Sequence, residues 1–128
     1  MESLLKLLEN SQQITHNVTR HITKKLNELD IDITIEMHRV LYTLSEENNL
    51  NQQQIADIIS RNKATLTSVI NNLEKRELIE RVEDAIDKRK KNVKLTPKGK
   101  QILEQTKPIV SEIYKSFYES ITPQEIEV

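Results

Sequence analysis

The spacing of the apolar residues changes twice along this chain of 128 residues, and this change constrains the fold more than any other feature. Over most of residues 4–75, and again over residues 102–117, apolar residues recur every three or four positions, as in amphipathic helices. Residues 78–95 contain short, partly alternating runs, which are typical of strands. With one Gly and 3% aromatic residues, a sandwich or barrel with Gly-rich turns is disfavoured. The sequence therefore predicts a mainly α fold with a small β-hairpin.

Capping residues divide the first part of the chain into four expected helices. A long amphipathic helix over residues 4–29 precedes a second helix that Thr34 can cap. Asn51 can cap a third, short helix, with Gln54 reaching back to it, and Asn62 can cap a fourth that ends near residue 75. The break between the last two is so short that they must cross steeply. We therefore expect helix-turn-helix geometry.

The second part of the chain predicts a wing followed by another long helix. Residues 78–82 and 92–95 form the expected hairpin, with a charged, solvated tip over residues 84–91. Thr96-Pro97 is a helix start, and Pro108 is expected to kink the helix that follows.

The last residues, 121–126, have the pattern of a further helix start, with a capping box and a pair of flanking isoleucines. Only two residues follow this start. We therefore expect the natural chain to extend beyond Val128.

Charge is distributed unevenly, although the net charge is only −1. Residues 55–100 carry 12 Lys and Arg against 7 Asp and Glu, a net charge of +5, whereas the remainder carries 7 against 13, a net charge of −6. Binding depends on the field at the contact face, so a near-neutral total is compatible with a nucleic-acid partner.

The absence of Cys excludes disulfides and thiolate zinc sites. No apolar run has the length of a signal or membrane helix, so we expect a cytoplasmic protein without a membrane partner.

The fourth helix carries small polar groups where an ordinary solvated helix would carry Glu and Lys. On a helical wheel, Ala64, Ser68 and Asn71 point away from the apolar face. Amides and hydroxyls can hydrogen-bond base edges in a major groove, and a small methyl group can approach thymine. The alternative is a merely solvent-facing polar helix. The expected DNA contacts of this helix are Asn62, Lys63, Ala64, Thr65, Thr67, Ser68, Asn71, Asn72 and Lys75.

The hairpin tip contains the run Asp87, Lys88, Arg89, Lys90 and Lys91. Asp87 precedes Arg89 by two residues, so its carboxylate could hold the guanidinium in a fixed direction. A directed Arg suits a narrow minor groove, and the lysines would neutralise phosphates. The alternative is an ordinary solvated charged loop.

These segments together resemble the MarR family of winged helix-turn-helix transcription factors. The resemblance rests on Asp87-x-Arg89-x-x-x-Val93-x-Leu95-Thr96-x-x-Gly99, on the helix-turn-helix over residues 55–75, and on the strand Leu78-Ile79-Glu80-Arg81. It implies a homodimer with interlocked first and last helices, recognition helices in successive major grooves, and Arg89 at the minor groove. Glu77 and Ser60 stand where the family usually has Gly.

The expected organisation is a single domain over residues 1–128, with residues 1–32 and 97–128 as dimerisation helices and residues 33–96 as the DNA-binding lobe. The predicted function is a sequence-specific regulator of transcription that binds double-stranded DNA, a ligand-responsive repressor that acts as a homodimer on an inverted repeat. The alternative function is a winged-helix protein-interaction module without direct DNA readout.

Catalysis is not supported, because the histidines lack a Ser or Cys partner at recognisable spacing and the chain has no Gly-rich phosphate loop. No metal site or cofactor is expected, because His16 and His21 are five residues apart on one helix. A metal-responsive switch through the histidines is a third alternative. The resemblance implies a small aromatic or phenolic effector, for which His16, His38 and Tyr42 are candidate contacts. For the pair His38 and Tyr42, ordinary packing is the competing interpretation.

Overall fold

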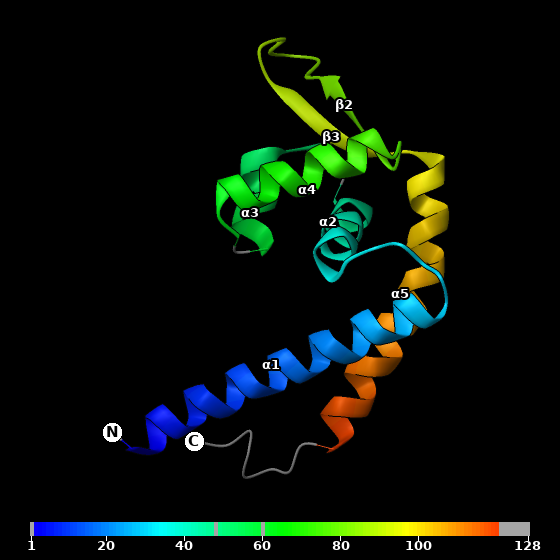
Figure 1. The fold of residues 1–128 in the computed structure, drawn as a ribbon. Coiled ribbons are helices and arrows are strands. Elements are labelled where there is room, and N and C mark those ends of the chain that lie inside the picture. Colours follow the sequence, from blue (N-terminus) through cyan, green and yellow to red (C-terminus); the bar gives the residue numbers. More distant parts are fainter. Residues whose placement is uncertain (1, 48, 60, 121–128) are drawn as a thin grey trace. The chain divides into compact units, whose positions relative to one another are not determined.

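The computed structural model describes residues 2–47, 49–59 and 61–120. The elements follow in the order α1 (Glu2–Glu28), α2 (Ile35–Glu46), β1 (Leu50–Asn51), α3 (Gln52–Ile59), α4 (Lys63–Lys75), β2 (Ile79–Glu83), β3 (Lys91–Leu95) and α5 (Pro97–Ser120) (Figure 1). The fold is mainly helical with a small antiparallel sheet, as the sequence predicts. None of the described helices is long and apolar enough to cross a membrane.

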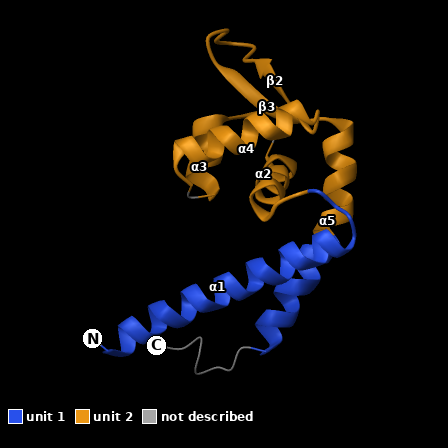
Figure 2. Cartoon of the chain, viewed as in Figure 1, with its two compact units in different colours: residues 1–32, 108–128 blue, residues 33–107 orange. Residues whose placement is uncertain are grey.

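The chain divides into two compact units, residues 1–32 with 108–128 and residues 33–107 (Figure 2). The first unit contains α1 and the later part of α5, and its buried apolar side chains include Val18, Ile22, Leu26 and Val110. The rings of His21 and Phe117 meet edge to face, with centroids 5.0 Å apart. The helix α5 continues through Pro108, and the kink expected there stays a prediction. The helix start expected over residues 121–126 lies outside the described residues, as does Ser60.

The second unit has its own apolar core, to which α2, α3, α4 and the sheet all contribute. The side chains with at most 1% exposure in this core are Val40, Leu41, Leu44, Ile55, Leu66, Ile70, Leu73, Ile79 and Val93. On the inner face of α4, Leu66, Ile70 and Leu73 are buried in this core, and Val69 is half-buried.

The predicted caps of α2, α3 and α4 are confirmed. Thr34 Oγ1 accepts a hydrogen bond from Met37 N at 3.1 Å. Asn51 and Gln54 exchange two bonds of 2.8 Å between side chain and backbone, which is a capping box. Asn62 Oδ1 accepts from Thr65 N at 2.8 Å and so begins α4. Local hydrogen bonds therefore fix where both helices of the helix-turn-helix start.

The sheet contains one strand more than the predicted hairpin. Its order is β1-β3-β2, and β1 pairs Leu50 with Val93. The sequence assigned Leu50 and Asn51 only to a helix start. This assignment was incomplete, because the two residues also pair with Val93 and Asn92 of β3.

Two backbone features shape the connections of α4 to the sheet and of the sheet to α5. Glu77 has φ 63°, and bonds from Glu77 N to Glu74 O and from Leu78 N to Leu73 O close the helix in a Schellman motif. At the start of α5, a Cβ on Gly99 would lie 2.0 Å from the carbonyl oxygen of Leu78. Only a glycine fits at residue 99 without a shift of the backbone.

Candidate nucleic-acid interface

The outer face of α4 is exposed, while its inner face is buried in the core of the second unit. Of the predicted contact residues on this helix, Thr67 is half-buried; Asn62, Lys63, Ala64, Thr65, Ser68, Asn71, Asn72 and Lys75 are exposed. A helix anchored on one side and carrying short polar groups on the other has the shape and chemistry to enter a major groove.

Some of these polar groups already have partners in the protein. Asn62 Oδ1 caps the helix. Thr67 Oγ1 donates to Lys63 O at 2.7 Å and accepts from Gln52 Nε2, which joins α3 to α4. These two residues thus position the helix whatever else they contact.

Arg81, on β2, contacts the outer face of α4. Its Nη2 donates to Asn71 Oδ1 at 2.9 Å, and its Nη1 donates to Glu74 Oε1 at 2.7 Å. Sequence reasoning missed this residue. Arg81 lies ten positions after Asn71 and seven positions after Glu74, in a different element. No helical or strand periodicity therefore indicates these contacts.

The hairpin tip is organised by Asp84, which the sequence analysis also missed. Asp84 Oδ1 accepts from Ile86 N at 2.8 Å and from Asp87 N at 3.0 Å, and Oδ2 accepts from Asn92 Nδ2 at 3.1 Å. The hydrogen bond from Asp87 N is the largest cause of the lowered pKa of the Asp84 carboxyl, followed by the bond from Ile86 N. An Asp side chain often accepts a hydrogen bond from the backbone two residues later, so an Asp at the start of this loop could have indicated the role.

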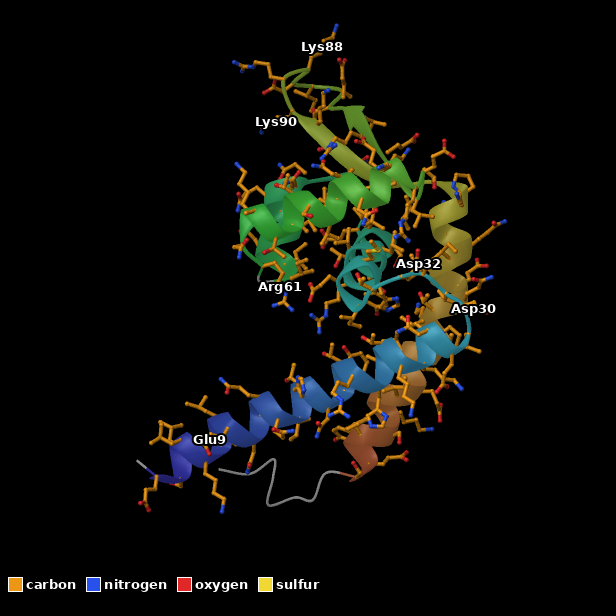
Figure 3. The ribbon with its side chains drawn as sticks, viewed as in Figure 1. Glu9, Asp30, Asp32, Arg61, Lys88 and Lys90 are labelled. Atoms are coloured by element: carbon orange, nitrogen blue, oxygen red, sulfur yellow. The ribbon has the colours of Figure 1, made fainter. Side chains whose placement is uncertain are left out.

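The expected contact between Asp87 and Arg89 is present. Asp87 Oδ1 accepts from Arg89 Nε at 3.3 Å and from Arg89 N at 3.1 Å, while the Arg89 side chain stays 92% exposed. Lys88, Lys90 and Lys91 are exposed as well, and Figure 3 shows Lys88 pointing outward from the hairpin tip. The tip therefore presents exposed cations on a backbone that is fixed by the hydrogen bonds of Asp84 and Asp87.

A bidentate ion pair fixes the turn that leads into α4. Arg61 donates from Nε and Nη2 to the two carboxylate oxygens of Glu36, at 2.9 and 2.7 Å. Arg39 adds a third contact at 3.0 Å. The hydrogen bond from Arg61 is the main cause of the lowered pKa of the Glu36 carboxyl. Arg61, labelled in Figure 3, thereby ties the helix-turn-helix to the first turn of α2.

The three candidate effector contacts are not all in one unit. His38 and Tyr42 lie on α2 in the second unit, with ring centroids 6.3 Å apart. His38 is buried, its Nδ1 lies 2.8 Å from Thr106 Oγ1, and burial, with a smaller contribution from Arg39, lowers the pKa of its imidazole. Tyr42 is exposed and has Lys107 Nζ 5.4 Å from its ring centroid.

His16 lies on α1 in the first unit. It lines a groove along that helix together with Thr19, Arg20, His21, Thr23, Lys24, Asn27 and Glu28. An effector site built from His16, His38 and Tyr42 stays a prediction. Within the described ranges, no three His, Asp or Glu side chains are grouped closely enough to hold a metal ion.

Known proteins share both this sequence pattern and this fold. Residues 33–91 match the MarR family. The transcriptional regulator HosA of Escherichia coli O157:H7 is 28% identical over 116 residues, which are 91% of this chain and 85% of HosA. MepR of S. aureus, in a crystal structure of its DNA complex, is 30% identical with a TM-score of 0.77, over 89% of this chain and 83% of MepR. The chain belongs to the MarR family.

Members of the MarR family are DNA-binding transcriptional regulators with a winged helix-turn-helix, and this chain is one of them rather than an enzyme. Wild-type MarR of E. coli in its apo form has the same fold, with a TM-score of 0.75 over 90% of this chain and 84% of that one, at 24% identity. The winged helix-turn-helix of this MarR-family protein comprises α3, α4 and the hairpin of β2 and β3.

Proposed function

We propose that this MarR-family protein is a ligand-responsive repressor that acts as a homodimer on an inverted-repeat operator. One observation carries most of the proposal: the exposed amide, hydroxyl and methyl groups of α4 lie in the same compact unit as the braced basic hairpin. In this proposal α4 reads base edges in the major groove, and Arg89 at the hairpin tip contacts the minor groove. The lysines of the tip neutralise phosphates on either side.

The homodimer accounts for apolar side chains that the single chain leaves in solvent. Leu4, Leu5 and Leu8 on α1 are about half exposed, and Tyr118 on α5 is 71% exposed. A second copy that covers them would bury this apolar surface. We therefore assign residues 1–32 and 97–128 to dimerisation and residues 33–96 to DNA binding.

The DNA partner is supported by the MepR structure, which is a DNA complex. Repression and a small aromatic or phenolic effector follow from the family resemblance, with His16, His38 and Tyr42 as the candidate contacts. The finer assignment of base-reading residues rests on the exposure and chemistry of α4.

Selection of bound duplexes from a random pool tests the proposal. A palindromic consensus with half-sites about one helical turn apart would support a dimer with two recognition helices. Selection of a single, non-repeated half-site would overturn the inverted-repeat assignment. The alternative, a protein-interaction module, predicts no retention on heparin or on random duplex at low salt.

A further inference from the structure

We propose that Arg81 is a positioning residue that fixes the direction of the Asn71 amide on α4 and thereby sets the hydrogen-bonding pattern that α4 offers to a base pair. The inference rests on the proposed role of α4 in reading DNA. Arg81 reaches α4 from β2, where it pairs with Val93 in the middle strand. Its guanidinium bridges Asn71 Oδ1 and Glu74 Oε1, two acceptors three residues apart and thus on adjacent positions of one helix face.

The chemistry of the two groups determines which end of the amide faces Arg81. A guanidinium has donors and no acceptor, so only the oxygen of the Asn71 amide can face it. The amide nitrogen must then point away from Arg81, on a residue whose side chain is exposed. The oxygen keeps a second lone pair, so the amide still presents a donor and an acceptor in a fixed order.

That fixed order matters for reading a base. The adenine edge in the major groove offers an acceptor at N7 and a donor at N6, and an asparagine amide matches them in only one orientation. An amide without Arg81 can rotate about χ2 by half a turn and present the reverse order. Loss of Arg81 should therefore reduce discrimination between base pairs more than it reduces total affinity.

The ion pair with Glu74 distinguishes the positioning role of Arg81 from a simple contribution of its positive charge to DNA affinity. Its carboxylate lies 2.7 Å from Arg81 Nη1, and the Arg81 side chain is only 26% exposed. A paired and partly buried cation adds little to the attraction of phosphates compared with the exposed cations of the hairpin tip. The affinity for random duplex should thus be almost independent of Arg81.

The test is competition binding with a selected duplex, its single-base variants and random duplex. Asn71→Ala first identifies the base pair that Asn71 reads. Arg81→Lys keeps the positive charge but loses the planar fork that spans two acceptors, and should lower discrimination at this base pair about tenfold. Affinity for random duplex should change by no more than about twofold. In the Asn71→Ala background the same substitution should have no further effect on discrimination.

Two further variants keep the test interpretable. Glu74→Gln loosens Arg81 without altering either partner of the Asn71 bond, and should give a smaller loss at the same base pair. Arg76→Ala removes the neighbouring contact in which Arg76 Nε donates to Asn72 Oδ1 at 3.2 Å, and should leave discrimination at this base pair unchanged. Thermal unfolding of each variant confirms that the lobe is folded.

The outcomes distinguish the inference from the proposed function. If Asn71→Ala loses base preference and folded Arg81→Lys keeps it, the positioning role is wrong and the reading role of α4 stands. If Arg81→Lys weakens specific and random duplex equally, Arg81 acts through phosphates or the fold, and the inference is again overturned. If Asn71→Ala changes no base preference, both the reading role of Asn71 and the inference fail. If the wild type binds no duplex, the proposed function, the reading role of Asn71 and the inference all fail.

Discussion

At the scale of single residues, Glu77 adopts a backbone conformation that costs free energy. Its φ of 63° lies in the left-handed region, which costs a residue with a Cβ roughly 1–2 kcal/mol. Glu77→Gly should therefore raise the free energy of unfolding by about 1 kcal/mol, less what glycine loses by its freedom in the unfolded chain. Urea denaturation measures this difference.

Glu77→Ala is the matched control, because alanine removes the same carboxylate but keeps the Cβ. It should leave the free energy of unfolding within about 0.5 kcal/mol of the wild type. Equal stability of the glycine and alanine variants would show that the left-handed conformation is not the source of the cost.

His38 predicts a pH dependence of stability. Burial lowers the pKa of its imidazole in the folded protein, so below the ordinary value of 6.5 the unfolded chain binds a proton that the folded chain does not. The contribution of His38 is fully present above pH 6.5 and is lost as the pH falls toward the folded-state pKa. The free energy of unfolding should decrease between pH 7 and pH 5.5, by at most about 1.4 kcal/mol per unit from this group.

His38→Gln removes this titration while an amide can still hydrogen-bond Thr106. Its free energy of unfolding should vary less over the same interval. The carboxyl groups of Glu36 and Asp84, whose pKa values are lowered from 4.5 and 3.8, contribute only at more acidic pH. An unchanged pH dependence in His38→Gln would contradict the assignment to His38.

At the scale of elements, Asn62 begins the helix proposed to read DNA. Its side chain caps α4, so Asn62→Ala should lower the free energy of unfolding by about 1 kcal/mol. Asn62→Asp keeps the capping oxygen and should keep the stability, but it adds a negative charge at the end of α4 that would face phosphates. Urea denaturation and duplex titration together should separate the two effects. Equal duplex affinity of Asn62→Asp and the wild type would place this helix end away from DNA.

Gly99, in the first turn of α5, lies against the backbone of Leu78, between the end of α4 and the start of β2. A Cβ at residue 99 would meet a backbone oxygen at 2.0 Å, so the backbone itself must move. Gly99→Ala should lower the free energy of unfolding by about 2 kcal/mol or more. Lys100→Ala, on the exposed next position, should stay within about 0.5 kcal/mol of the wild type. Urea denaturation measures both values. Equal free energies of unfolding for the two variants would contradict the close approach of Gly99 to Leu78.

The elements that the sequence predicts best are those with local causes. Asn51, Gln54 and Asn62 act on residues three positions away, so their spacing alone indicates the caps. The pairing of Leu50 with Val93 and the contact of Arg81 with Asn71 depend on how distant segments pack. No periodicity encodes such contacts, and this is why β1 and Arg81 were missed.

For the whole molecule, the uneven distribution of charge indicates a DNA partner better than the net charge does. The chain as a whole has a net charge of −1, yet the cations of the hairpin tip gather at one end of the second unit (Figures 1 and 3). The same arrangement predicts a strong salt dependence of DNA binding, because each neutralised phosphate releases condensed counterions.

The central claim is that exposed cations of the wing and of α4 contact the phosphates of duplex DNA. Titration of a selected duplex at several salt concentrations tests this claim most directly. If each dimer neutralises roughly ten phosphates, the logarithm of the association constant should fall with the logarithm of salt concentration with a slope of about −9. A combined replacement of Lys88, Lys90 and Lys91 by Ala should reduce that slope to about −4, since roughly six phosphate contacts per dimer are lost. A slope near zero for the wild type, or one that the triple replacement leaves unchanged, would contradict the account.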